Sequence, residues 1–174
     1  MSDPRVEASG SAVRPVELAL LVSVFVVAAC GLVYELAAGT LASYLLGDSI
    51  LQFSTVIGTY LFAMGVGSWL SRYLERQLVA QFLRIELLVG LIGGLMPAAL
   101  FALQTAPTAS FRFALYALVL AVGILVGLEI PLVMRILRRH AGADGNGRGG
   151  LKTLVSQVLT FDYLGALAVS IAFP

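Results

Sequence analysis

The sequence predicts an all-α protein, a polytopic membrane helix bundle of about five transmembrane helices with a cytoplasmic N-terminus. Of its 174 residues, 59% are hydrophobic and only 12% are charged, whereas a soluble domain carries about 25% charged residues. Five stretches each contain the roughly 20 mostly apolar residues that cross a bilayer as one helix. Basic residues gather in alternate loops, which sets the predicted orientation.

The elements follow from apolar runs and the turn residues between them. Residues 1–15 are predicted to be a disordered lead-in. They are not read as the start of a signal peptide, because the apolar stretch that follows is too long for one. The helical bundle occupies residues 16–174, and "GDS" at 47–49 is expected to form its first tight turn. "QTAPTAS" at 104–110 has loop chemistry, and "RRHAGADGNGRGG" at 138–150 is predicted to be a flexible cytoplasmic loop. The predicted spans are about 16–46, 50–73, 80–103, 111–137 and 151–174.

The distribution of basic residues predicts a multi-pass protein of the inner (plasma) membrane with its N-terminus in the cytoplasm. Cytoplasmic loops are enriched in lysine and arginine. The opposite loops hold almost no basic residues, with only Arg112 just inside the fourth span. The basic residues on the predicted cytoplasmic side are Arg5, Arg14, Arg72, Arg76, Arg84, Arg135, Arg138, Arg139, Arg148 and Lys152.

Composition also excludes several function classes. The net charge is +1, and no basic face with interleaved aromatic residues appears, so no nucleic-acid partner is expected. Cys30 and His140 are the sole cysteine and histidine, and neither has acid or thiol partners at ligand spacing, so no metal site is expected. The glycines of "GADGNGRGG" lack the preceding strand that a nucleotide-binding motif requires. We therefore expect no cofactor.

Glycines are frequent in the predicted spans and indicate close packing between helices. Gly90 and Gly94 form one GxxxG pair, and Gly123 and Gly127 form another. Small residues at this spacing allow two membrane helices to approach closely. Other glycines line the second span at positions Gly58, Gly65 and Gly67. We predict that these residues serve helix packing and bind no ligand.

Three acids within the apolar spans are the candidate intramembrane functional residues: Glu35, Glu129 and Asp162. A fourth acid, Glu86, lies nearer the cytoplasmic edge. A charged side chain at the bilayer centre costs about 2.5–3.5 kcal/mol by insertion scales. None of the three has a basic residue three or four positions away, where a helical ion-pair partner would lie. Their partners must be other helices, protons or a bound cation.

The segment "GLEIP" at 127–131 predicts a helix kink beside an acid. Pro131 has no N–H, so the carbonyl of Gly127 loses its helical partner. One interpretation places Glu129 near the cytoplasmic boundary, in an ion pair with a snorkelling arginine. In the other interpretation the acid and the freed carbonyl bind a ligand or cation, as in transporters with broken helices. The arginines available for the ion pair are Arg72, Arg84 and Arg135.

The other two acids lead to different expectations. Asp162 is about 15 Å along its helix from Lys152 at 1.5 Å per residue, and this depth makes it the strongest candidate for a functional intramembrane acid. Glu35 lies between Gly31 and Gly39. We therefore expect Glu35 to reach across a tight helix contact.

Three stretches in combination are similar to a known family. They are "CGLVYELAAGTLASYLLGDSILQFSTVIGTYLFAMGVGSWLSRYL" (30–74), "VGLEIPLVMRIL" (126–137) and "LTFDYLGALAVS" (159–170). They resemble the N-terminal transmembrane region of membrane-integrated spermidine synthase-like proteins. Glu35, Asp48, Glu129 and Asp162 occupy motif positions, but the resemblance implies no role for them.

The resemblance implies a scaffold without the catalytic part. In that family further helices and a cytoplasmic domain usually follow, and the domain resembles enzymes that move an aminopropyl group from decarboxylated S-adenosylmethionine to putrescine. This chain stops at "SIAFP" near the fifth span and contains no soluble α/β domain, so we expect it to be part of something longer. No nucleophile–base pair or metal constellation can be assembled from its residues. No catalytic residue is predicted, and enzymatic activity of this chain alone is not expected.

Three functions remain open from the sequence. The first is a membrane scaffold or anchor of a spermidine synthase-like protein, embedded in the lipid bilayer. The second is a transport module in which the acids converge on a cation such as a polyamine. The third is an accessory subunit that packs against other membrane chains, or against copies of itself. Convergence of the acids on one water-accessible cavity favours transport, separate interhelical contacts favour a scaffold, and stable co-purification with other chains favours an accessory subunit.

Overall fold

The computed structural model describes residues 15–75, 77–105, 107–141 and 147–173, and all secondary structure within these ranges is helical. This confirms the predicted all-α class for the described residues, while the lead-in at 1–14 lies outside them. Five of the described helices are long and apolar enough to cross a membrane. The elements are α1 (Pro15–Leu46), α2 (Ser49–Leu70), η1 (Ser71–Tyr73), α3 (Leu78–Ala102), η2 (Leu103–Thr105), α4 (Thr108–Ala141) and α5 (Gly147–Ala172).

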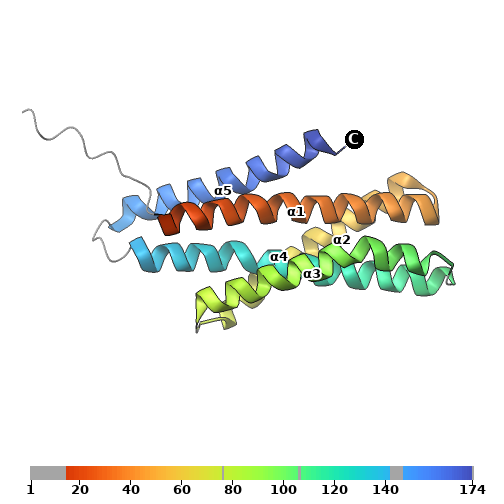
Figure 1. Cartoon of the computed structure of the whole chain (residues 1–174), viewed down its shortest axis with the longest axis horizontal. Coiled ribbons are helices and arrows are strands. Elements are labelled where there is room, and N and C mark those ends of the chain that lie inside the picture. The colour runs from red at the N-terminus through yellow and green to blue at the C-terminus, as the bar shows by residue number, and fades with distance from the viewer. Residues whose placement is uncertain (1–14, 76, 106, 142–146, 174) are drawn as a thin grey trace, which may run out of the picture.

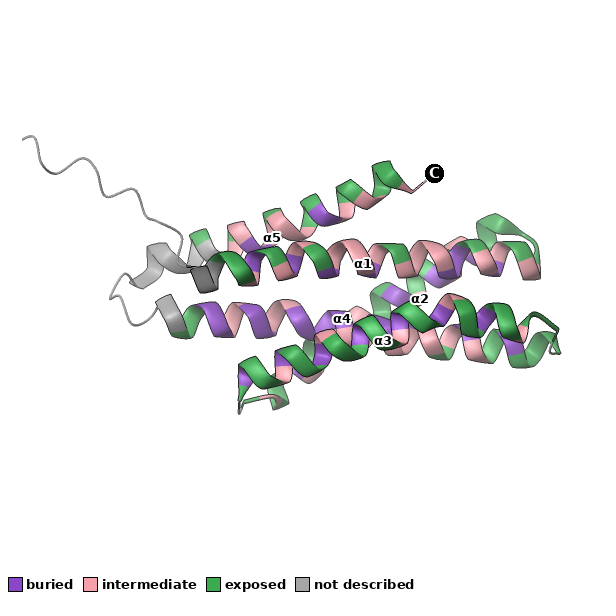
Figure 2. Ribbon diagram, in the orientation of Figure 1, coloured by how far each residue is buried: buried purple, intermediate pink, exposed green. Residues whose placement is uncertain are grey.

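Helix α4 is the central element of the bundle. It packs against α2, α3 and α1, while α5 packs mainly on α1 (Figure 1). Half of the most apolar stretch of α4 is buried, against 11% of the corresponding stretch of α5, so α5 is the most peripheral helix (Figure 2). The chain runs in the same direction along α1 and α5, and α5 diverges from α1 toward its C-terminal end (Figure 1).

The turn between α1 and α2 has the chemistry that "GDS" predicts. Gly47 and Asp48 both have positive φ, 72° and 46°, a conformation that glycine and aspartate adopt more readily than other residues. The Asp48 carboxylate accepts a hydrogen bond from the backbone N–H of Leu51 at 3.2 Å. This bond satisfies an amide that has no partner within the helix, so Asp48 caps the N-terminus of α2.

Helices α4 and α5 extend beyond the apolar runs from which they were predicted. Helix α4 begins at Thr108, where the Pro107 carbonyl accepts the N–H groups of Ser110 and Phe111. It continues through Pro131 to Ala141, and α5 begins at Gly147. The helices therefore extend into both ends of the loop predicted at 138–150. At the end of α4, arginine sustains the helix beyond its apolar run. Residues 142–146 of that loop lie outside the described residues.

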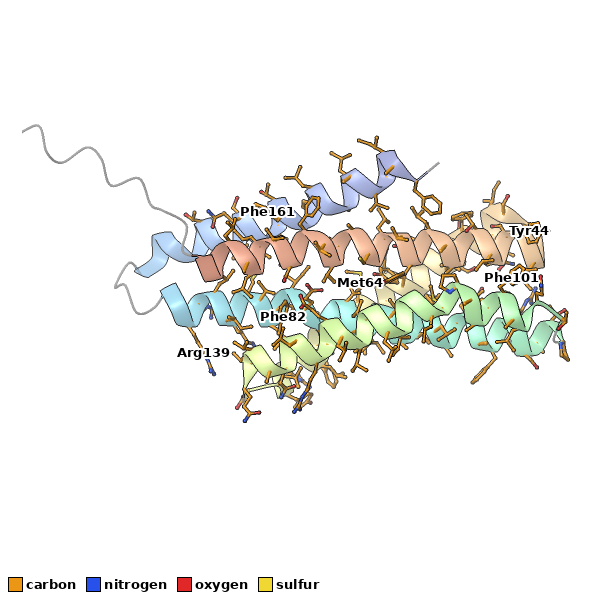
Figure 3. All side chains as sticks on the ribbon, viewed as in Figure 1. Tyr44, Met64, Phe82, Phe101, Arg139 and Phe161 are labelled. Carbon is orange, nitrogen blue, oxygen red and sulfur yellow. The ribbon has the colours of Figure 1, made fainter. Side chains whose placement is uncertain are left out.

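The contact between α2 and α4 depends on glycines of both helices. A Cβ atom on Gly127 would overlap the backbone of Met64, which lies in the middle of the bundle (Figure 3). A Cβ atom on Gly123 would lie 2.7 Å from the Cβ of Ala63. From the other side, Gly67 meets the backbone of α4 in the same way. Only residues without a side chain allow these two backbones to approach so closely.

The other predicted glycine pair faces away from the bundle. Gly90 and Gly94 are exposed, and a Cβ on either would meet no atom within 4 Å. Neither glycine therefore packs against another helix of this chain, because α3 turns a different face inward, and a packing role against another chain stays a prediction. The inward glycine of α3 is Gly93, whose hypothetical Cβ overlaps the ring of Tyr34. Gly58 and Gly65 of α2 likewise have no neighbour within 4 Å.

Candidate functional site: a buried acidic cluster

Three acids from three helices lie around one tyrosine, and an acid from a fourth helix lies near one of the three. Tyr60 is 5% exposed and lies about 16 Å along α2 from Ser49 at 1.5 Å per residue, near the midpoint of the helix. Its hydroxyl is within electrostatic range of the carboxyl groups of three acids, and a fourth acid is within range of Glu129. We call these four residues the acidic cluster: Glu35 of α1, Glu86 of α3, Glu129 of α4 and Asp162 of α5.

Two glycines admit Tyr60 to this position. A Cβ on Gly31 of α1 would lie 2.8 Å from the Tyr60 hydroxyl oxygen, and a Cβ on Gly123 of α4 would lie 3.4 Å from its ring. The absence of side chains at both glycines therefore lets the tyrosine project between α1 and α4. Glu35 lies four positions after Gly31 and hence on the same face of α1. The acids stand out in the sequence but Tyr60 does not, because an aromatic residue in an apolar helix has the same pattern as a core residue.

Glu129 is the most enclosed member of the acidic cluster. The residue is 3% exposed, and its Oε1 atom has no hydrogen-bond partner. Its carboxyl group lies within electrostatic range of Glu86 and Asp162, which have the same sign of charge. Of these two, Glu86 also has a hydrogen bond to the side chain of Ser23. A buried carboxylate oxygen without a partner is energetically costly and is uncommon in folded proteins.

The ion pair that the sequence suggested for Glu129 is not formed among the described residues. Arg135 instead donates hydrogen bonds to the carbonyls of Ser71, at 2.9 Å, and Leu74, at 3.1 Å. The cause is the length of α4. The helix continues to Ala141, which leaves Glu129 about 18 Å from that end at 1.5 Å per residue, within the bundle and away from its rim.

Another arginine named for that ion pair also has different partners. The Arg72 guanidinium carbon lies 3.9 Å from the centroid of the Trp69 ring, and its Nη2 atom donates to the Tyr73 hydroxyl at 2.7 Å. The third, Arg84, is an exposed residue of α3. Arg72 therefore joins an exposed aromatic group at the end of α2 rather than the acidic cluster.

The remaining predicted site residues are placed as follows. Pro131 lies inside α4, two positions beyond Glu129, and Gly127 lies against α2. Cys30 shares a side-chain hydrogen bond with Tyr34. Within the described residues, no three histidine, cysteine or acidic side chains are arranged to hold a metal ion. The cluster thus brings Glu35, Glu129 and Asp162 within electrostatic range of Tyr60 without forming such a group.

Comparison with known proteins identifies relatives that are much longer than this chain. It is 62% identical over 156 residues to polyamine aminopropyltransferase 2 of Ralstonia nicotianae. The matched region covers 89% of this chain and 29% of the relative. It is 53% identical over 158 residues to the polyamine aminopropyltransferase of Leptospira interrogans, covering 91% and 30% respectively. It is 40% identical over 161 residues to polyamine aminopropyltransferase 1 of Streptomyces coelicolor, covering 92% and 29%. No family model matches the chain, and no solved structure matches it. The chain spans less than a third of the length of these relatives.

Proposed function

We propose that this chain, which is homologous to the N-terminal part of polyamine aminopropyltransferases, is the membrane anchor of an enzyme of that kind. The observation that carries the proposal is the apolar outer surface of the bundle. Leu87, Phe113 and Ile171 are each more than 70% exposed, and they belong to three different helices. Apolar surface of this extent is stable against lipid but costly in water.

The ends of the bundle support an orientation with the α2–α3 connection in the cytoplasm. Trp69, Arg72 and Tyr73 form an exposed group at the end of α2, and Trp and Tyr are enriched at membrane–water interfaces. Arg139 lies at the same end of the bundle as the start of α3, whereas Tyr44 and Phe101 lie at the opposite end (Figure 3). The positive-inside rule then assigns the Arg139 end to the cytoplasm.

The anchor has a positional role in this proposal. The bundle would hold aminopropyl transfer, carried out by another part of the protein or by a partner, at the inner face of the membrane. A cation transport module is a second candidate, favoured because acids from three helices lie within electrostatic range of one hydroxyl and a fourth acid lies within range of Glu129. Uptake of a labelled polyamine into vesicles that contain only this chain would distinguish transport from anchoring.

Cysteine labelling tests the anchor and its orientation together. With Cys30→Ala as the background, Gln104→Cys and Glu75→Cys place single thiols at exposed positions in connections at opposite ends of the bundle. A membrane-impermeant maleimide is expected to label only Gln104→Cys on intact cells and only Glu75→Cys on inverted vesicles, because the bilayer separates the two ends. Mass spectrometry of the alkylated protein measures both. Equal labelling of the two cysteines from one side would contradict a spanning anchor.

A further inference from the structure

We infer that the acidic cluster is a binding site for a linear amine cation that carries two or more ammonium groups. The inference goes beyond the anchor role and does not depend on it, because it rests on the geometry of Tyr60, Glu129 and the acids around them. Each of the five long helices contributes one residue to this region, so a ligand bound there would touch the whole bundle.

The described arginines do not neutralise the acidic cluster. Its four acids lie within the bundle, whereas the described arginines lie toward the helix ends. Arg135 is bonded to backbone carbonyls, Arg72 stacks on aromatic rings, and Arg84 and Arg112 are exposed. Buried carboxylates are stable only when they are paired, protonated or bound to a cation. Four protonated acids would hold no cation, so saturable binding of an amine distinguishes bound acids from protonated ones.

Glu129 provides a second observation that points to a ligand. Its Oε1 atom is buried and has no hydrogen-bond partner. The residue is 3% exposed and lies in the most buried helix, so water does not replace the missing partner. The same carboxyl group faces Glu86 and Asp162, both of which disfavour its negative charge. An ammonium group among these carboxylates would donate the missing hydrogen bond to Oε1 and reverse the local repulsion.

The separation of the acids favours an elongated ligand over a metal ion. The carboxyl groups influence one another electrostatically, but no three described acids have the spacing that a metal ion needs. A linear amine can place its ammonium groups beside different carboxylates several ångströms apart. Apolar side chains lie beside the acids, since Val126 is buried and precedes Glu129 by three positions on the same face of α4. Methylene groups fit such a surface, and the Tyr60 hydroxyl and ring can accept a cation.

Spermidine binding to the purified chain tests this inference. The protein is held in an uncharged detergent, which avoids binding of the amine to acidic lipid, and binding is measured by isothermal titration calorimetry. Wild-type protein is expected to bind spermidine saturably with one site. Glu129→Gln is expected to weaken binding by about tenfold or more, the effect of losing one charge-assisted hydrogen bond. Asp162→Asn is expected to do the same, and it serves if Glu129→Gln does not fold.

Matched controls separate the cluster from general charge attraction. Glu75→Gln removes an exposed acid in the α2–α3 connection, and its spermidine affinity is expected to equal that of wild type. Butylamine, with one ammonium group, is expected to compete poorly. The inference is overturned if no saturable binding occurs, if both cluster variants bind as wild type does, or if Mg²⁺ displaces spermidine at equal concentration. None of these results affects the anchor, because the variants are still expected to remain in the membrane.

Discussion

Leucine at position 127 is expected to prevent the bundle from assembling. A Cβ on Gly127 already overlaps the main chain of Met64, and a main chain cannot move aside as a flexible side chain can. Overpacking of an interior costs about 1–3 kcal/mol, and occasionally more; a backbone overlap belongs at the upper end. We therefore expect Gly127→Leu to lose most of its monodisperse fraction in size-exclusion chromatography in detergent.

Gly94→Leu is the matched control for this substitution. The position is exposed, and its Cβ would meet no atom within 4 Å, so the same change in volume should leave the elution profile and melting temperature unchanged. A normal profile for Gly127→Leu would contradict the close contact between α2 and α4. Aggregation of Gly94→Leu would instead show that the outer face of α3 packs against another chain, as the accessory-subunit hypothesis requires.

Glu129→Leu is expected to stabilise the bundle when no amine is present. The carboxyl group is buried, lacks a partner at Oε1 and faces two other acids. Leucine has a similar volume and removes both the unsatisfied oxygen and the repulsion. Replacement of buried charged groups by apolar residues often gains about 1–4 kcal/mol, and we expect a gain of about 2 kcal/mol in the free energy of unfolding. Thermal unfolding in detergent measures it as an increase in melting temperature.

Glu75→Leu is the control, because this exposed acid has no unfavourable burial to relieve. Its melting temperature is expected to stay close to that of wild type. If Glu129→Leu instead lowers the melting temperature, the carboxyl group holds the bundle together through its neighbours, and the role of Glu129 is structural. A gain in stability would mean that the acid is retained at a cost to the fold, which is typical of functional sites.

The number and type of the helices could be predicted from sequence because length and apolar content alone fix them. The turn at Asp48 could also be predicted from sequence, since few residues adopt a left-handed backbone and cap a helix at once. The helix ends near residues 108 and 141 were harder to predict from sequence. An apolar run marks the part of a helix that suits lipid, and polar residues such as Arg138 and Arg139 extend it further.

The rotation of each helix could not be read from sequence in the same way. Both faces of α3 are apolar, so the spacing of Gly90 and Gly94 gave no sign that Gly93 is the residue that turns inward. Which residues lie near Glu129 also depends on how each neighbouring helix is rotated about its axis. The predicted span ended at about residue 137, whereas α4 continues to Ala141 and leaves Glu129 deeper within the helix. Tyr60 enters the site through the gaps at Gly31 and Gly123.

The central claim, that this bundle anchors aminopropyl transfer, is tested most directly in membranes from the native organism. The chromosomal copy would be tagged at its N-terminus, solubilised in mild detergent and isolated, and transfer of a labelled aminopropyl group to putrescine would be measured on the isolated material. The account predicts that the activity co-isolates with the tag, in the same polypeptide or in a partner chain. Isolated bundle without transferase activity, while the activity stays in the soluble fraction, would contradict it.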